Sequence, residues 1–236
     1  MNVLIVHAHY EQESFSSALM HCAVDVFESG GHEVRVSDLY KMNWNPVASA
    51  SDFGEREHSE YCVYALEQRK ACQAGTIARD IAGEIEKVKW CDLLIFNFPM
   101  FWCSAPAILK GWIDRVFVSG LFYGGTRFYD RGGMTGKRAM VTLTLGGRDH
   151  MFGKDAIHGE LDVMLRHLVR GTLGYCGFEV LKPFAAYHVP YISDEERGVI
   201  LDDYRIALRD IAARQSVDFP KLSDFDEAMR PLRPSV

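Results

Sequence analysis

The chain has 236 residues, of which 48% are hydrophobic, and its formal net charge is -6. A chain of this size can bury a sizeable core without disulfides or a structural metal. Because its 32 acidic residues outnumber its 26 basic ones, nothing in the charge favours binding to nucleic acid or to an anionic membrane surface.

The cysteines and the first residues of the chain indicate the cellular compartment of the protein. Six cysteines are scattered without a C-x-x-C pair, which is typical of reduced thiols rather than a disulfide framework or a zinc site. The first residues form an apolar run without a basic lead, so we interpret them as a strand and not as a signal peptide. No apolar run approaches the roughly 20 residues that span a bilayer. We expect a cytoplasmic protein.

Short apolar runs recur along the chain, as in strands that are covered on both faces of a parallel sheet. They lie at residues 3–7, 33–37 (a weaker, alternating run), 93–98, 139–145 and within 178–189. Helical patterns follow at 15–29, 77–88, from Pro106 to Val116, 157–173 and 195–213. Strand and helix thus alternate five times, which predicts an α/β fold with a doubly wound parallel sheet and helices on both faces.

Two irregular stretches and a tail complete the chain. Residues 39–59 and 119–137 have no periodicity, and the second stretch is rich in glycine and aromatics, as an active-site lid would be. The tail contains Pro220, Pro231 and Pro234. We predict one domain over 1–216 and a C-terminal arm over 217–236 that wraps a partner subunit or is disordered.

Ligands of open α/β sheets bind outside the carboxyl ends of the strands, so the loops after strands one, three and four are candidates. The first loop lacks G-x-G-x-x-G, which argues against ordinary dinucleotide binding. It ends in Ser14, Ser16 and Ser17 at a helix start, where backbone N–H groups favour a phosphate. The alternative is plain N-capping by Ser14.

The other two loops fit a flat ring. Trp102, flanked by Phe101, would lie at the mouth of the sheet and contact a ring such as isoalloxazine, although it could also simply cap the core. Gly146 and Gly147 would let main-chain amides approach the ligand and stabilise the anionic edge of a reduced flavin, or could form an ordinary turn. The combination of three such loops favours a flavin site.

A metal site is the competing interpretation of the first loop. His7 and His9 face the same side of an extended chain, as in barrel hydrolases. Five strands fall short of an eight-stranded barrel, and no Asp/His ligand set follows the later strands. We expect no metal, and a metal-dependent hydrolase is the least favoured alternative.

The segment 98–117 (FPMFWCSAPAILKGWIDRVF) resembles the NAD(P)H:quinone oxidoreductases of the DT-diaphorase type and their bacterial relatives. Further matches lie at His9 with Ser14 and Phe15, and at 37–46, 144–147, 157–160 and 175–178. The resemblance implies a flavodoxin-like fold with five strands in the order 2-1-3-4-5, and a homodimer. It also implies FAD as cofactor, with NAD(P)H as co-substrate and a quinone-like, nitroaromatic or azo acceptor.

The resemblance also assigns roles to residues. His158 matches the catalytic histidine, Tyr123 would cover the pocket, and Gly146 and Gly147 would stabilise charge. Arg197 matches an arginine near the adenine end, which favours FAD over FMN. The implied cofactor-binding set is His9, Ser14, Phe15, Ser16, Pro99, Met100, Phe101, Trp102, Cys103, Thr144, Leu145, Gly146, Gly147, Phe152 and Arg197.

Three positions depart from the family pattern. Phe152 stands where the family has a tyrosine that works with the histidine, Gly125 replaces a second lid tyrosine, and Cys103 replaces a phenylalanine beside the flavin. We therefore predict a flavin-dependent NAD(P)H:quinone oxidoreductase with ping-pong turnover. The alternative is a regulatory flavoprotein that docks on a membrane channel or transporter, for which the sequence offers no dedicated segment.

Overall fold

The computed structural model describes residues 1–56 and 60–232 of the chain. Its parallel sheet has the strand order β2-β1-β3-β4-β5, and β6 also pairs with β4. The predicted order is therefore confirmed, with the fifth strand split in two. The strands are β1 (Asn2–His7), β2 (Glu33–Asp38), β3 (Leu93–Pro99), β4 (Arg138–Thr144), β5 (Glu179–Val180) and β6 (Phe184–Ala186).

The split of the fifth strand has a local cause. Pro183 has no N–H to give to the sheet, and a proline is excluded from the interior of a paired strand. The N–H of Lys182 turns away from β4 and donates to the carbonyl of Gln215 at 2.8 Å. The apolar run 178–189 thus forms two short strands around a break instead of one.

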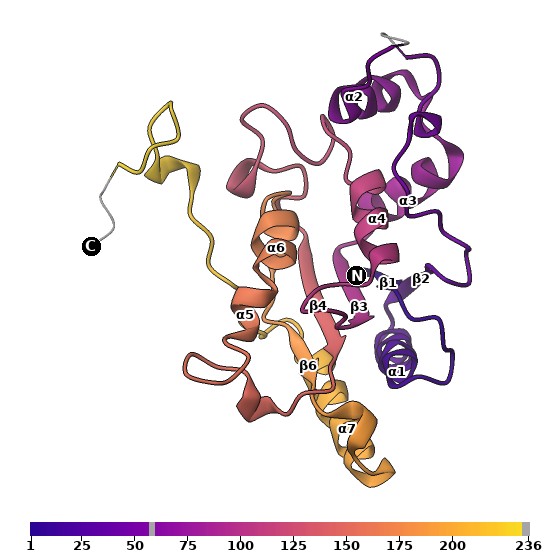
Figure 1. The fold of residues 1–236 in the computed structure, drawn as a ribbon, viewed down its shortest axis with the longest axis vertical. Helices are drawn as coiled ribbons and strands as arrows, with labels where there is room; N and C mark the ends of the chain where they lie inside the picture. The colour runs from indigo at the N-terminus through magenta and orange to yellow at the C-terminus, as the bar shows by residue number, and fades with distance from the viewer. Residues whose placement is uncertain (57–59, 233–236) are drawn as a thin grey trace.

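Helices cover both faces of the sheet (Figure 1). Buried side chains of α1 and α7 pack on one face, while those of α3, α4 and the segment from α5 to the π-helix pack on the other. The predicted 15–29 helix is confirmed residue for residue. The helices are α1 (Phe15–Ser29), α2 (Tyr64–Ala74), α3 (Arg79–Trp90), α4 (Ala107–Val116), α5 (Leu161–Met164), α6 (Arg166–Leu168), a π-helix (Val169–Gly174) and α7 (Asp194–Arg209).

Two helical segments differ from the sequence prediction. The pattern over 157–173 becomes helical only at Leu161, because Gly159 has a positive φ of 76° that ends the preceding turn. The predicted start at Ile157 is therefore wrong, and His158 lies in a loop. Helix α2 was not predicted. It is held by polar contacts, among them a hydrogen bond of 2.9 Å from Gln68 Nε2 to the carbonyl of Asp114.

The irregular stretch is described over residues 39–56, with 57–59 outside the described residues, and it is fixed to α4 by a buried ion pair. Arg115 donates to both carboxylate oxygens of Asp52, at 3.2 and 2.8 Å, and to Asp80 at 2.8 Å. Burial alone would raise the pKa of Asp52, but hydrogen bonds from Arg115 and Tyr64 outweigh it and hold the pKa below its ordinary value. This stretch is thus an anchored part of the fold and not a loose loop.

Near its C-terminal end the chain pairs with the edge of the sheet through a single bridge, between Leu181 and Ser216, and then leaves the sheet. Val217 N–H donates to the carbonyl of Val180 at 2.7 Å, so backbone pairing with β5 crosses the predicted boundary at 216/217. Farther on, Leu222 N–H donates to Asp130 at 3.0 Å, and Figure 1 shows the last described residues in yellow, away from the sheet. Among the described residues, no helix combines the length and apolar character needed to cross a membrane.

Candidate functional site

The start of α1 forms one side of the candidate site. Ser14 caps the helix by accepting a hydrogen bond of 3.1 Å from Ser17 N–H, so the capping interpretation holds. The first-turn N–H groups of a helix have no intrahelical acceptor and attract an anion. Buried Ser16 forms a hydrogen bond of 2.8 Å with Thr144 on β4, which brings the first and the last of the three loops together. Capping and anion binding can therefore coexist here.

A cavity of about 330 Å³ opens at this carboxyl edge of the sheet. Most of its lining comes from the three loops that the sequence analysis selected. The lining residues are His9, Ser14, Phe15, Ser16, Pro99, Met100, Phe101, Thr144, Leu145, Gly146, Val189 and Pro190. One wall carries hydroxyls and a helix N-terminus, and another carries apolar side chains, which suits a flat, partly apolar ligand that bears a phosphate.

A layer of buried polar side chains supports the cavity from the α1 face of the sheet. Asn97 Nδ2 donates to His7 Nδ1 at 3.0 Å and to the carbonyl of Ser16 at 2.8 Å. His7 Nε2 lies 3.2 Å from Ser17 Oγ. Because Nδ1 accepts, Nε2 carries the proton and donates. Burial lowers the pKa of His7 to about 4, so the ring is neutral near pH 7.

This arrangement bears on the metal hypothesis. Both ring nitrogens of His7 are used in hydrogen bonds, and His9 Nδ1 accepts a hydrogen bond of 3.0 Å from Glu11 N–H. In the part of the chain that the structure describes, no group of three or more His, Cys, Asp or Glu side chains could hold a metal ion.

The turn between β3 and α4 presents its aromatic side chain outward. Phe101 and Ser104 exchange backbone hydrogen bonds of 2.9 and 3.0 Å. Trp102 and Cys103 between them have positive φ angles of 50° and 58°, which non-glycine residues adopt rarely. Trp102 is 100% exposed, so the core-capping interpretation of Trp102 is wrong. The sequence placed Trp102 and Cys103 on the cavity, but in one copy of the chain neither lines it.

Other predicted site residues lie beside the cavity. A Cβ on Gly147 would meet Phe152, whose ring centroid lies 5.1 Å from that of His158. These three residues form a group next to Gly146. Arg197 donates to the carbonyl of Val189 at 3.1 Å and to Asp194 at 2.5 Å, and so supports the cavity wall from behind.

Tyr123 lies at a different cavity from the residues of the candidate flavin site. It lines a separate cavity of about 300 Å³ with Asp114, Tyr175 and Cys176, and burial raises its pKa. The lid around it is held by Arg69, which donates to Ser119 Oγ at 2.9 Å. One copy of the chain therefore does not bring Tyr123 to the candidate flavin cavity.

Two wall residues were missed by the sequence analysis. Val189 and Pro190 follow the fifth strand and reach the same carboxyl edge as the other loops. The Val-Pro dipeptide directly after an apolar run was a usable signal, since proline ends a strand and begins a loop.

Comparison with known proteins identifies the family. A family model described as a flavodoxin-like fold matches residues 1–209. The chain is 37% identical to NAD(P)H dehydrogenase [quinone] 1 of Rattus norvegicus, over 94% of this chain and 82% of the rat protein. The chain therefore belongs to the flavodoxin-like family and, within it, to the NAD(P)H dehydrogenase [quinone] family.

Further members of the NAD(P)H dehydrogenase [quinone] family agree with this. Ribosyldihydronicotinamide dehydrogenase [quinone] of Mus musculus is 41% identical over 89% of this chain and 91% of the mouse protein. The crystal structure of a Klebsiella pneumoniae protein proposed as a quinone reductase is 32% identical, with a TM-score of 0.93 over 100% of this chain and 98% of that one. The chain is thus an oxidoreductase, and these comparisons do not favour a regulatory channel subunit.

Proposed function

We propose that the protein transfers a hydride from NAD(P)H, through a bound flavin, to a quinone-type acceptor. The observation that carries this proposal is the cavity that joins the N-terminus of α1 to an apolar wall at the carboxyl edge of the sheet. Its relatives named for quinone reduction support the same reaction.

The residues present fit a flavin. Ser14, Ser16 and the first-turn amides of α1 would hold the phosphate, and Met100 and Phe101 would contact the ring. The flavin, when bound, would accept the hydride and pass it on. We propose FAD because Arg197, which holds the Val189 wall, matches an arginine near the adenine end of the cofactor in the family that the chain resembles. The donor and acceptor would use the same space in turn, which gives ping-pong kinetics.

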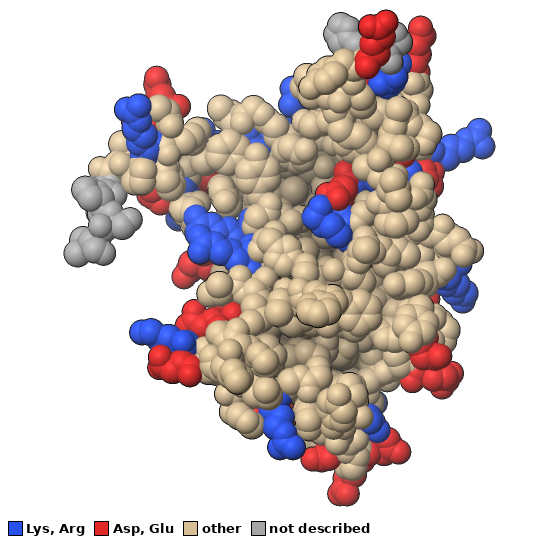
Figure 2. All heavy atoms as spheres, viewed as in Figure 1, with Lys and Arg blue, Asp and Glu red and all other residues tan. Residues whose placement is uncertain are grey.

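We further propose that a second copy of the chain completes the site. The cavity volume of about 330 Å³ lies near the lower end of small-molecule pockets, and an FAD needs more walls. Large apolar side chains are exposed next to the cavity loops, with Trp102 at 100%, Ile157 at 82% and Tyr191 at 73%. Figure 2 shows a face with few charged residues at its centre. Such a surface is suited to a homodimer interface, across which Tyr123 would cover the partner's site.

His158 would assist by stabilising negative charge on the reduced ring. Phe152 has no hydroxyl, so the remaining donors are the amides of Gly146 and Gly147 together with the His158 imidazole. Replacing His158 with alanine should slow flavin reduction about tenfold to several-hundredfold, with flavin content unchanged. Stopped-flow traces of the anaerobic reductive half-reaction measure this. Reduction at the wild-type rate would make His158 structural.

The decisive test is the identity of the bound cofactor. Purified protein should show the absorption bands of an oxidised flavin, and chromatography of the released cofactor should give FAD. NAD(P)H should bleach these bands without acceptor, and quinones, nitroaromatics or azo compounds should restore them. Colourless protein that takes up neither FAD nor FMN on reconstitution would refute the proposed function.

A further inference from the structure

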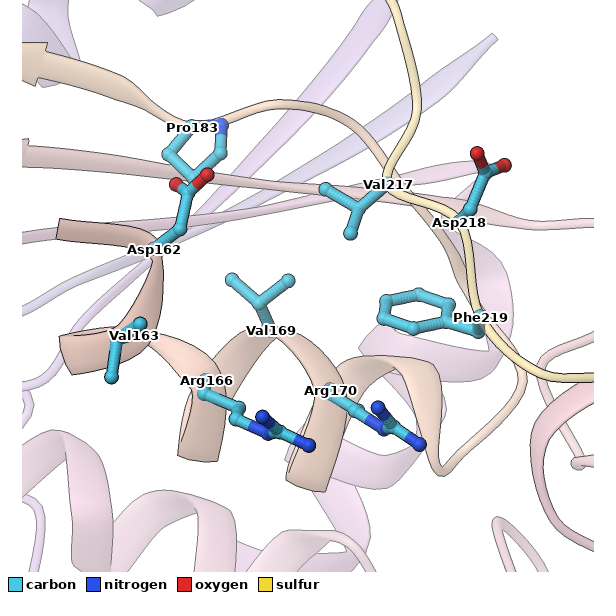
Figure 3. Close-up of a pocket in the computed structure, with 9 residues that line it drawn as sticks. All are labelled: Asp162, Val163, Arg166, Val169, Arg170, Pro183, Val217, Asp218 and Phe219. Carbon is cyan, nitrogen blue, oxygen red and sulfur yellow. The ribbon is translucent and has the colours of Figure 1, made fainter. Parts of the chain in front are cut away.

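Two arginines outside the candidate flavin cavity form no ion pair within the described part of the chain. Arg166 and Arg170 are four residues apart where α6 continues into the π-helix, so their side chains lie on the same helical face. Both arginines border the cavity of about 240 Å³ drawn in Figure 3, where their guanidinium groups point the same way, and Asp162 and Asp218 lie on the opposite side of that cavity. Within residues 1–56 and 60–232, neither arginine has a hydrogen bond or an ion pair, whereas Arg205 is paired with Asp202.

The arginine pair borders an open hollow of about 470 Å³. The described residues that line it include no carboxylate; they are Tyr129, Val163, Arg166, His167, Arg170 and Gly171. Figure 2 shows a blue cluster beside the position of α6. Like charges one helical turn apart repel each other weakly, and an anion held between the two guanidinium groups would relieve this repulsion. In a chain with a net charge of -6, this concentration of positive charge points to a ligand.

The hollow is linked directly to the loop that would hold the flavin ring. His167 Nδ1 donates to the carbonyl of Met164 at 2.9 Å, which leaves Nε2 as the acceptor in this tautomer. Ser104 Oγ, at the end of the Phe101–Ser104 turn, donates to this Nε2 at 2.9 Å. The continuous segment of α6 and the π-helix therefore carries the arginine pair, and its His167 fixes the turn that contains the cavity residue Phe101.

We propose that Arg166 and Arg170 form a binding site for a phosphate-type oxyanion beside the flavin loop. Two guanidinium groups supply planar, charge-assisted donors for such a group. This inference rests on the proposed function, because a dinucleotide donor whose nicotinamide lies at the flavin carries a pyrophosphate. A separate phosphate-bearing ligand has the same chemistry, and the kinetics below distinguish the two sources.

The first experiment measures phosphate binding without turnover. Flavin-loaded protein is titrated with inorganic phosphate at constant ionic strength, and binding is followed by calorimetry and by the melting temperature. Loading with flavin occupies the anion site at α1. We expect Arg166→Gln/Arg170→Gln to weaken phosphate binding tenfold or more, while Arg205→Gln/Arg209→Gln, a second i,i+4 pair on α7, leaves it unchanged. Arg166→Lys/Arg170→Lys keeps the charge and should retain part of the affinity.

The second experiment compares hydride donors with and without phosphate. If the site takes the donor's phosphates, Arg166→Gln/Arg170→Gln should raise KM for NADH and NADPH about tenfold. It should change KM less than twofold for reduced nicotinamide riboside, which has no phosphate. Weaker phosphate binding with unchanged KM values would assign the site to a separate anionic ligand. This result would still support the proposal that Arg166 and Arg170 bind a phosphate-type anion.

Two results would overturn the inference. One is equal phosphate affinity in wild type and in the glutamine variant. The other is a change of oligomeric state in that variant by light scattering, which would make the pair a contact between copies. Neither result depends on the proposed function, which fails instead if the wild type binds no flavin.

Discussion

The two adjacent glycines after β4 should respond differently to the same substitution. A Cβ at Gly147 would lie 2.8 Å from Cε2 and 3.0 Å from Cζ of Phe152, well inside the 3.5–4.0 Å of ordinary carbon contact. A Cβ at Gly146 would meet only Tyr191 Cε2, at 3.9 Å. Gly147→Ala must therefore displace the Phe152 ring, whereas Gly146→Ala fits the unliganded chain.

The magnitudes follow from this geometry. Overpacking costs about 1–3 kcal/mol, and replacing glycine with alanine returns about 0.4–1 kcal/mol by restricting the unfolded chain. We expect Gly147→Ala to lower the free energy of unfolding by about 0.5–2 kcal/mol, which is roughly 1–8 °C in Tm for a chain of this size. Gly146→Ala should leave Tm unchanged or slightly raised, but its methyl group enters the cavity and should weaken flavin binding.

Thermal unfolding of flavin-free protein, followed by circular dichroism, separates the two variants. Adding Phe152→Leu to Gly147→Ala makes room for the methyl group and should recover part of the lost Tm. The reasoning is wrong if Gly147→Ala melts at or above the wild-type temperature, or if Gly146→Ala is the less stable of the two.

Three further predictions concern buried and loop-fixing contacts. Because the pKa of His7 falls from 6.5 to about 4 on folding, unfolding takes up a proton between these values, and the free energy of unfolding should drop by about 3 kcal/mol as pH falls from 6.5 to 4. His7→Gln should flatten this dependence in urea titrations at pH 4–8. Arg115→Gln leaves the Asp52 carboxylate buried and unpaired, and should cost about 3–5 kcal/mol by urea unfolding, unlike Arg115→Lys, which should cost less. Ser104→Ala and His167→Ala should each loosen the flavin turn, and a double-mutant cycle on flavin affinity should give a coupling of about 0.5–1.5 kcal/mol; strictly additive effects would contradict the hydrogen bond.

The parts of the fold that were predictable are those fixed by local periodicity. The run at 93–98 and the helical pattern at 15–29 have apolar residues at spacings that bury one face or both, and the structure has β3 and α1 there. Helix α2 escaped prediction because its buried side chains include the polar Glu67 and Gln68, which no apolar pattern marks. Tertiary contacts of Tyr64, Gln68 and Arg69, and not apolar periodicity, hold this helix in place.

In the candidate site too, residues placed by local sequence patterns were predictable, and residues placed by tertiary contacts were not. Loops at the carboxyl edge are positioned by the strands before them, so Ser16, Met100 and Gly146 were brought together as the topology required. Tyr123 and His158 lie in long loops. The conformation of such a loop depends on individual backbone angles and contacts, such as the positive φ at Gly159. No spacing rule gives such conformations.

The buried polar layer under the cavity has a consequence for how the sheet assembles. His7, Asn97 and Thr142 stand opposite one another on β1, β3 and β4. A slip of any of these strands by one residue would turn its polar side chain into the apolar core on the other face, without a hydrogen-bond partner. An unpaired buried polar group costs about 1–3 kcal/mol, so misregistered pairings are penalised strand by strand. The residues that support the ligand cavity thereby also select the correct alignment of three strands that are far apart in the sequence.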